Sequence, residues 1–161
     1  MIGVLLLVFA AEARPAPPVV VTVAEPDEVR IVAGGRAEAR LVVTIKEGFR
    51  IQANPASEPY LVPARLELED RDRVRVGAPE YPAGQPYRLR GASSDLSVYK
   101  GTFVIRVPLE AALSAATDTP PSGELVLDGT LRYQACNDVM CLRPSSVPVR
   151  LPIRIEPPRE R

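Results

Sequence analysis

The sequence predicts an all-β protein, folded as an antiparallel sandwich of short strands. Several segments alternate apolar and polar residues with a period of two, the pattern of strands with one buried face. Turn-forming Gly, Pro, Asn and Asp residues stand between these segments. The 18 prolines argue against a helical bundle, because an interior proline breaks a helix. A length of 161 residues with 46% hydrophobic side chains suits one domain with its own core.

The N-terminus carries features of an export signal. Residues 2–11 form a continuous apolar run that is too short to span a bilayer as a helix. Ala11-Glu12-Ala13 follows as a small-x-small cleavage pattern, so residues 1–13 are interpreted as a signal peptide. No Lys or Arg precedes the apolar run, which leaves an uncleaved anchor or a disordered start as the alternatives. Residues 14–18 then form a Pro-rich leader, residues 19–156 the domain, and residues 157–161 a polar tail.

The first half of the domain contains three predicted strands. Residues 19–23 are rich in β-branched side chains, and Gly34-Gly35 marks a turn. Residues 39–46 alternate strictly, and residues 65–69 alternate again. Residues 54–60 form a loop by composition, interpreted as a connection between two sheets or as a surface that shapes a functional site. The mixed-sign charges of residues 69–73 predict a solvated turn.

The second half contains three longer alternating segments. Residues 78–85 form a turn rich in Pro and Gly, and residues 96–109 form the longest predicted strand. Residues 109–116 are expected to form one or two helical turns, followed by a loop over residues 118–123. Residues 125–135 and 147–155 are the last two strands. Pro148 and Pro152 lie on one face of the final segment, which predicts an edge or bulged strand.

Composition excludes several classes of function. The chain has no histidine, so Ser-His-Asp and Cys-His nucleophiles and the usual zinc enzymes are excluded. Lys and Arg together number 20, as do Asp and Glu, which gives no electrostatic case for binding nucleic acid or an anionic membrane. There is no Gly-rich phosphate loop, and the absence of histidine and of any further cysteine argues against a four-ligand metal site at the two cysteines. We therefore expect neither a cofactor nor a metal.

The only two cysteines, Cys136 and Cys141, are separated by four residues. A disulfide between them would close a ring of about six residues and contribute only about 2 kcal/mol. A bridge across a tight Asn137-Asp138 turn would also be strained, because opposite strand residues are spaced wider than a relaxed disulfide requires. Strained and exposed disulfides are the exchangeable ones. The alternative is a structural clip on a hairpin.

Three segments carry a resemblance to a known family. The cysteine segment, YQACNDVMCLRPSSVPVRLPI, resembles that of the N-terminal periplasmic domain of the thiol:disulfide interchange protein DsbD, also called the disulfide bond corrector domain. Two more segments resemble the same family: GFRIQANPASEPYLVPARLELE, and YPAG followed by LSVYKGTFVIRVPL. Together they span about residues 40–155. The resemblance implies an immunoglobulin-like fold.

The resemblance also implies roles at the cysteines, with Cys141 as the attacking sulfur and Cys136 as its resolving partner. Residues 87–95 resemble a cap loop that covers the disulfide. The family has an aromatic residue there, and Tyr87 or Leu89 is the nearest candidate in this sequence.

Two charged neighbours act in opposite directions on the cysteines. Arg143 lies two residues past Cys141 and would lower its pKa, whereas Asp138 would raise it. Tyr133 and Gln134 precede the pair, and Tyr133 is expected in the core.

Two functional hypotheses follow. In the first, the chain is a periplasmic or secreted thiol:disulfide oxidoreductase module, not itself transmembrane, that uses the Cys136/Cys141 dithiol. The resemblance implies thioredoxin-like redox proteins, disulfide isomerases or cytochrome c maturation proteins as partners, with a membrane electron transporter as donor. In the second, the chain is an immunoglobulin-like binding or structural module with a purely structural disulfide. The reduction potential separates them, because structural disulfides lie below about −300 mV.

Overall fold

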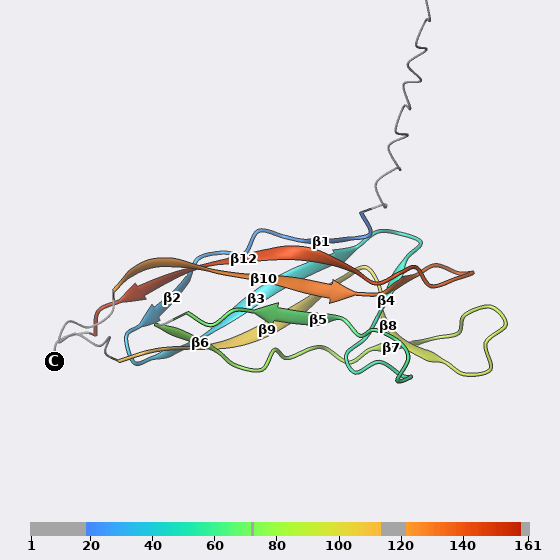
Figure 1. The fold of residues 1–161 in the computed structure, drawn as a ribbon, viewed down its shortest axis with the longest axis horizontal. Helices are drawn as coiled ribbons and strands as arrows, with labels where there is room; N and C mark the ends of the chain where they lie inside the picture. The colour runs from blue at the N-terminus through green and yellow to red at the C-terminus, as the bar shows by residue number, and fades with distance from the viewer. Residues whose placement is uncertain (1–18, 72, 114–121, 159–161) are drawn as a thin grey trace, which may run out of the picture.

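The computed structural model describes residues 19–71, 73–113 and 122–158, which form twelve strands and no helix (Figure 1). The predicted signal peptide and Pro-rich leader lie outside the described residues, as does the end of the predicted tail. The all-β prediction is therefore confirmed for the described part of the chain. The strands form three four-stranded sheets.

The first sheet has the strand order β1-β3-β9-β6. Its members are β1 (Val21–Val23), β3 (Arg36–Ile45), β9 (Thr102–Ala111) and β6 (Val74–Val76). All of its pairs are antiparallel. The predicted strand at residues 39–46 corresponds to the C-terminal part of β3, which ends at Ile45. There Ala39, Leu41, Val43 and Ile45 are buried and their neighbours are exposed.

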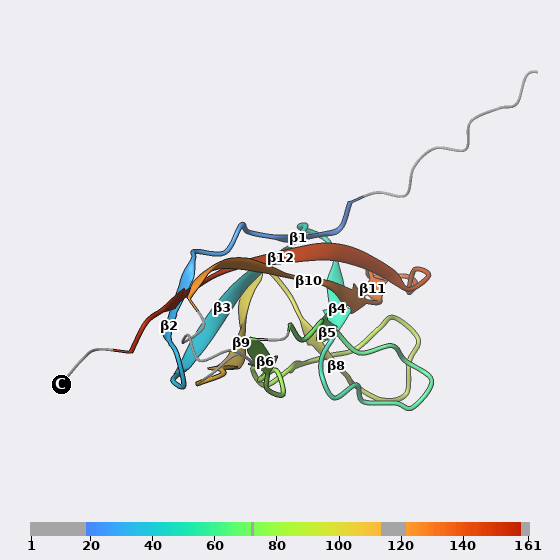
Figure 2. The same cartoon turned by 60° about the vertical axis from the view of Figure 1, so that its left-hand side comes forward.

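The second sheet has the order β2-β12-β10-β5. Its members are β2 (Val29–Val32), β12 (Ser145–Glu156), β10 (Gly123–Tyr133) and β5 (Arg65–Leu68). Figures 1 and 2 show β10 and β12 arching over β3 and β9, so the two sheets form the layers of a sandwich. Their inward residues join one hydrophobic cluster, whose fully buried members include Leu41, Ile105, Leu127, Leu131, Leu151 and Ile153.

The N-terminal segment passes from one layer to the other. β1 pairs with β3 in the first sheet, and β2 pairs with β12 in the second. The β2–β12 pair is parallel, which the prediction of a purely antiparallel sandwich did not include. A segment that changes sheets meets a different neighbour at each position, so its pairing can be antiparallel in one sheet and parallel in the other.

The prolines of β12 lie in the part of the strand that pairs with β10 alone. Pro148 faces Thr130 and Pro152 faces Val126 of β10, whereas β2 pairs only with residues 153–156. The edge-strand prediction is confirmed for the proline-bearing part of β12 and is wrong for its last four residues. Proline has no N–H to offer a second strand, so the prolines fall in the part of β12 that lacks one.

The predicted helical turn at residues 109–116 is wrong at its start. Leu109 and Ala111 belong to β9, where Leu109 pairs with Ala37 and Ala111 with Val74. Two neighbouring strands supply hydrogen bonds and packing there, and this tertiary pairing overrides the helical preference of the local alanines. Residues 114–121 lie outside the described residues.

The third sheet lies at one end of the sandwich and has the order β11-β4-β8-β7 (Figures 1 and 2). Its members are β11 (Ala135–Cys136), β4 (Arg50–Gln52), β8 (Leu96–Tyr99) and β7 (Gln85–Tyr87). Residues 53–64 connect β4 to β5, so the loop predicted at residues 54–60 does link two sheets. This small sheet places Cys136 beside residues from the middle of the sequence.

Candidate functional site

Cys136 and Cys141 form a disulfide with an S–S distance of 2.04 Å and a Cα–Cα distance of 3.9 Å. The two residues also form an isolated antiparallel bridge. The Asn137 N–H donates to the Met140 carbonyl at 3.0 Å, and the Leu142 N–H donates to the Ala135 carbonyl at 2.7 Å. The disulfide therefore closes a small hairpin whose strands are already joined by backbone hydrogen bonds.

Residues 137–140, between the bridged cysteines, form a tight turn that contains Asn137 and Asp138. The side-chain oxygen of Asn137 accepts hydrogen bonds from the backbone N–H groups of Val139 and Met140, at 2.9 and 2.8 Å. Asparagine commonly closes turns in this way. Val139 and Met140 are exposed at the hairpin tip.

The two sulfur-bearing residues differ in exposure. Cys136 has no solvent-exposed surface, whereas Cys141 is half-buried. Ala135 is also buried, although a regular strand would place neighbours on opposite faces. The strand is not regular here: β10 ends at Tyr133, and β11 joins the third sheet by pairing with β4. Tyr133 is buried in the core, as the sequence predicts.

Gln52 lies beside the disulfide in β4. Its side-chain amide donates a hydrogen bond to the Cys136 sulfur at 3.2 Å and lies 4.0 Å from the Cys141 sulfur. Gln52 is fully buried, and its side-chain oxygen has no hydrogen-bond partner. β4 pairs with β11 on one side and with β8 on the other, so the backbone that carries Gln52 is fixed from both sides.

Asp138 joins the hairpin loop to two other strands. Its Oδ1 atom accepts hydrogen bonds from Arg50 of β4 at 2.8 Å and from the Tyr87 hydroxyl of β7 at 2.9 Å. The Arg50 guanidinium lies over the Tyr87 ring, 3.8 Å from its centroid. These hydrogen bonds, Tyr87 first, hold the pKa of Asp138 below its ordinary value. Partial burial and the bond to Asp138 raise the pKa of Tyr87.

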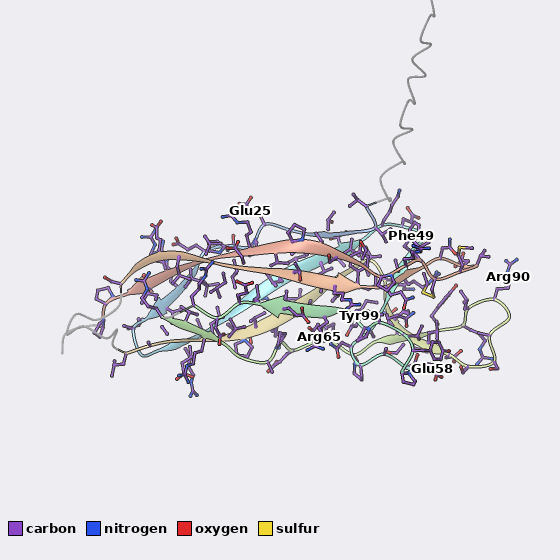
Figure 3. All side chains as sticks on the ribbon, in the orientation of Figure 1. Glu25, Phe49, Glu58, Arg65, Arg90 and Tyr99 are labelled. Carbon is purple, nitrogen blue, oxygen red and sulfur yellow. A yellow bond between two sulfur atoms is a disulfide. The ribbon has the colours of Figure 1, made fainter. Side chains whose placement is uncertain are left out.

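The predicted supporting residues differ in whether they contact the disulfide hairpin. Tyr87 reaches the hairpin through the hydrogen bond from its hydroxyl group to Asp138. Leu89 is half-buried in the loop of residues 88–95 that joins β7 to β8. Arg143 is exposed, and none of the contacts of the described residues joins it to either cysteine. Figure 3 shows Arg90 and Glu58 at the end of the molecule that carries the disulfide.

Sequence reasoning missed Arg50 and Gln52. Both lie in the GFRIQANP segment, which resembles the family, but no local signal marks them as neighbours of the cysteines. Gln134 supports the same region: its oxygen accepts from the Val62 N–H at 3.1 Å, and its amide donates to the Leu142 carbonyl at 3.2 Å.

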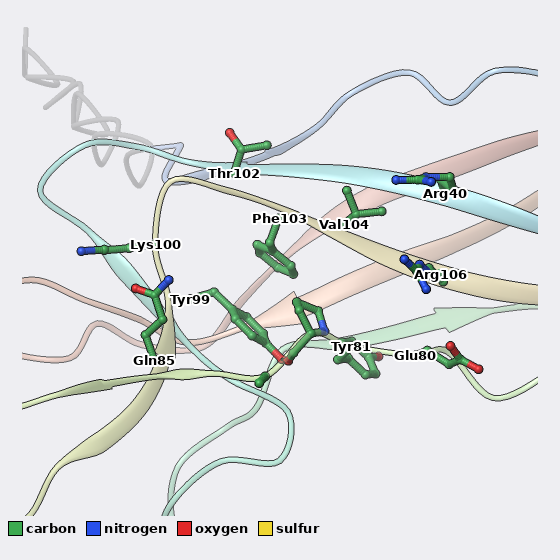
Figure 4. Close-up of a pocket in the computed structure, with 12 residues that line it drawn as sticks. Arg40, Glu80, Tyr81, Gln85, Tyr99, Lys100, Thr102, Phe103, Val104 and Arg106 are labelled. Atoms are coloured by element: carbon green, nitrogen blue, oxygen red, sulfur yellow. Dashed lines mark hydrogen bonds between the residues drawn. The ribbon is translucent and has the colours of Figure 1, made fainter.

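A separate open cavity of about 580 Å³ lies beside β9 and the segment of residues 80–85, and neither cysteine lines it (Figure 4). Tyr99 stacks on Phe103 at 4.3 Å in this cavity, and its hydroxyl donates to the Pro82 carbonyl at 2.9 Å. The same hydroxyl accepts from the Asn54 N–H at 3.1 Å. These contacts fix the loop after β4, so the aromatic side chains act as a structural support for the site.

The described part of the chain contains no helix with the length and apolarity needed to cross a lipid bilayer. The comparison with curated proteins gave no match.

Among solved structures, the N-terminal periplasmic domain of ScsB from Proteus mirabilis is similar, with 15% identity and a TM-score of 0.52. The match covers 81% of this chain but only 44% of the solved ScsB chain, so this chain spans less than half of the length of that domain. The reduced N-terminal domain of DsbD from Neisseria meningitidis matches with 15% identity and a TM-score of 0.42, covering 74% of this chain and 79% of that one.

The family model described as "Thiol:disulfide interchange protein DsbD, N-terminal" matches residues 21–152. This range contains the disulfide hairpin, β4 and β7, and the sandwich has the expected immunoglobulin-like architecture with one parallel pair added. The chain therefore belongs to the family of the N-terminal domain of the thiol:disulfide interchange protein DsbD.

Proposed function

We propose that the chain is an exported thiol–disulfide exchange module that passes reducing equivalents to oxidised partner proteins through Cys136 and Cys141. The observation that carries the proposal is the asymmetry of the disulfide, in which Cys136 is fully buried and Cys141 is only half-buried. An incoming thiolate needs access to one sulfur only, and the other sulfur then leaves. Cys141 is the accessible member, which agrees with the attacking role that the family resemblance implies.

The exchange needs no cofactor. The Cys141 thiolate attacks one sulfur of the partner's disulfide, that S–S bond breaks, and the partner's second sulfur leaves as a thiolate. The Cys136 thiolate then attacks the Cys141 sulfur, the mixed disulfide breaks, and the partner's first sulfur also leaves as a thiolate. Two electrons have moved to the partner, and the Cys136–Cys141 disulfide has formed. A donor dithiol restores the reduced pair by the reverse sequence.

The partners proposed are thioredoxin-like redox proteins, including disulfide isomerases and proteins of cytochrome c maturation. A membrane electron transporter is the proposed donor. Family membership supports the redox-partner class, and the match to a periplasmic domain supports an exported location.

Tyr87, Asp138 and Arg50 are proposed to hold the hairpin between encounters with partners. The carboxylate of Asp138 is bound from two strands, so the loop that carries Cys141 is tethered to β4 and β7. Leu89 is proposed as part of the cap loop, and Arg143 as an exposed charge that favours the Cys141 thiolate.

Trapping of a mixed disulfide tests the exchange function. Replacing Cys136 by Ala should leave Cys141 unresolved and trap a disulfide-linked complex with an oxidised thioredoxin-like protein. Replacing Cys141 by Ala should abolish trapping, because the remaining thiol is buried. The readout is non-reducing electrophoresis, with the double Cys136→Ala, Cys141→Ala variant as the control.

The reduction potential of the wild-type pair is the second readout. If neither single variant traps a partner and the potential lies below about −300 mV, the disulfide is a structural clip. The exchange function would then be rejected in favour of a binding or structural module.

Export is tested by N-terminal sequencing of protein recovered from the periplasm or medium. Cleavage near Ala13 is expected, because Ala11-Glu12-Ala13 follows the apolar run. Recovered protein that still carries residues 1–10 would contradict a cleaved signal peptide.

A further inference from the structure

The side chain of Gln52 is incompletely satisfied in the oxidised protein. Its amide N–H group donates to the buried Cys136 sulfur at 3.2 Å, and a disulfide sulfur is only a weak acceptor. Its oxygen is buried and has no hydrogen-bond partner. A buried polar atom without a partner costs free energy, and such atoms are rare in folded proteins. Gln52 is therefore poorly matched to the state in which the two sulfurs are joined.

Reduction supplies the groups that the Gln52 amide lacks. Opening the disulfide creates a thiol, which can donate a hydrogen bond, or a thiolate, which is a strong acceptor. The amide can donate its N–H to a thiolate, or turn about its terminal bond and accept from a thiol. One side chain can thus serve either protonation state of the reduced Cys136.

We propose that Gln52 is a catalytic residue of the exchange site, whose amide stabilises the reduced form of Cys136 and makes Cys136 the better leaving group when a donor attacks Cys141. The proposal deepens the exchange function above and rests on it. In this proposal, the Gln52 amide stabilises the reduced cysteine pair more than the disulfide.

Burial explains why Cys136 needs such a group. Cys136 has no exposed surface, and burial in apolar surroundings raises the pKa of a thiol. A thiolate with a high pKa is a poor leaving group in disulfide exchange. The Gln52 N–H is the hydrogen-bond donor to this sulfur that the structure shows among the described residues. The nearby charges, Arg50 and Asp138, bond to each other at the hairpin loop.

The first test is the pKa of the Cys136 thiol, measured by thiolate absorbance in a Cys141→Ala background. The charged and titratable groups at the hairpin, Arg50, Tyr87, Asp138 and Arg143, stay unchanged. Replacing Gln52 by Met keeps a similar volume but removes the amide. We expect the pKa of Cys136 to rise by about one unit, the size expected when one hydrogen bond to a charged group is lost.

The second test is the reduction potential of the intact pair in glutathione buffers. Without the amide, the reduced state loses stabilisation, so the equilibrium constant for reduction should fall about tenfold. That change corresponds to about 30 mV towards a more negative potential. The rate at which a small thiol opens the disulfide should fall as well, because the leaving sulfur is less stabilised.

Two further variants separate this role from loosening of the structure. Gln52→Asn keeps the amide but is shorter by one methylene, so it should shift the pKa and potential in the same direction as Gln52→Met. Gln134→Met removes a nearby amide whose bonds go to backbone groups of Val62 and Leu142 and not to sulfur. It should destabilise the fold with little change in either redox value.

The inference is overturned if both Gln52 variants are folded by circular dichroism and leave the pKa and potential at wild-type values. It is also overturned if the potential becomes less negative, or if Gln134→Met shifts it as much as Gln52→Met. These results are distinct from failure of the exchange function, which shows in the wild type as absent trapping and a potential below about −300 mV.

Discussion

Asp138 is a residue at which three distant parts of the sequence meet. It lies between the two cysteines, and its carboxylate binds Arg50 and Tyr87, which are 88 and 51 residues away. Sequence reasoning places Asp138 beside the cysteines only as a charge that opposes thiolate formation. In the folded protein that charge is neutralised by the adjacent guanidinium. Its structural effect is to tether the hairpin loop.

The tether predicts a pH dependence. Hydrogen bonds from Tyr87 and Arg50 lower the pKa of Asp138 from its ordinary value of 3.8. A carboxyl with a lowered folded-state pKa stabilises the protein above its unfolded-state pKa, and this contribution is lost as the pH falls through the folded-state value. Wild type should therefore be more stable than Asp138→Asn at neutral pH, and the difference should shrink below pH 3.8. Denaturant unfolding of both proteins, at neutral pH and at a pH below 3.8, measures the difference in the free energy of unfolding. The same difference at both pH values would contradict the prediction.

The Tyr87 hydroxyl predicts an effect on access to the disulfide. Replacing Tyr87 by Phe removes the hydrogen bond to Asp138 but keeps the ring under Arg50, whereas replacement by Ala removes both contacts. Reduction of the disulfide by a small thiol should become faster in Tyr87→Phe, and several-fold faster in Tyr87→Ala, because the hairpin is less constrained. Tyr60→Phe is a matched control in an exposed side chain. Equal reduction rates in the wild type and all three variants would show that Tyr87 does not restrict access to the disulfide.

At the scale of elements, β10 is the strand on which the second sheet depends. It pairs with β12 along its whole length and with β5 through residues 129–132. Gly129 lies at the start of the β5 contact, and a Cβ atom there would come 2.1 Å from the Glu67 backbone oxygen. Backbone cannot move aside as a flexible side chain can, so this position requires glycine.

Gly129→Ala should therefore destabilise the domain. The added methyl group forces β5 and β10 apart, and overpacking of this kind typically costs about 1–3 kcal/mol. Thr130→Ser, an exposed change at the next residue, should stay within about 0.5 kcal/mol of wild type. Urea unfolding measures both values. If Gly129→Ala is as stable as Thr130→Ser, β5 and β10 can move apart at this position without loss of stability, which would contradict the prediction.

At the scale of the whole molecule, the disulfide lies in the hairpin that begins at β11, in the third sheet at one end of the sandwich. Cys136 is buried, and its neighbours Ile51 and Ala135 belong to the hydrophobic cluster. The disulfide nevertheless joins residues only five apart in the sequence, so it does not link the two large sheets. The hairpin strands are held together by their own backbone hydrogen bonds as well as by the sulfurs. A domain built in this way can open its disulfide and stay folded.

Reduction of the wild type, or the double Cys136→Ala, Cys141→Ala change, should thus lower the free energy of unfolding by only about 2 kcal/mol, because the closed ring is short. The far-ultraviolet circular dichroism should remain that of a β protein. Denaturant unfolding with and without reductant gives the value. Loss of the folded baseline on reduction would show that the disulfide is essential to the fold.

The sequence by itself determined the all-β class and most of the strands, because period-two alternation and proline content are local properties. It also determined the disulfide pair, since only two cysteines are present, and the family resemblance offered Tyr87 or Leu89 as the residue nearest to the pair. The sequence did not predict the strand at residues 109–111, because pairing of β9 with β3 and β6 outweighs the local helical propensity there.

Only the tertiary structure decided which side chains surround the sulfurs. Gln52 lies 84 residues before Cys136 in the chain, and β4 brings the two together by pairing with β11. The relative exposure of the two cysteines was likewise set by the switch of the chain from β10 to β11, which buries Cys136 completely and leaves Cys141 half-buried. Strand pairing between distant segments has no local signature, because a strand's sequence records which face is buried but not which strand lies beside it.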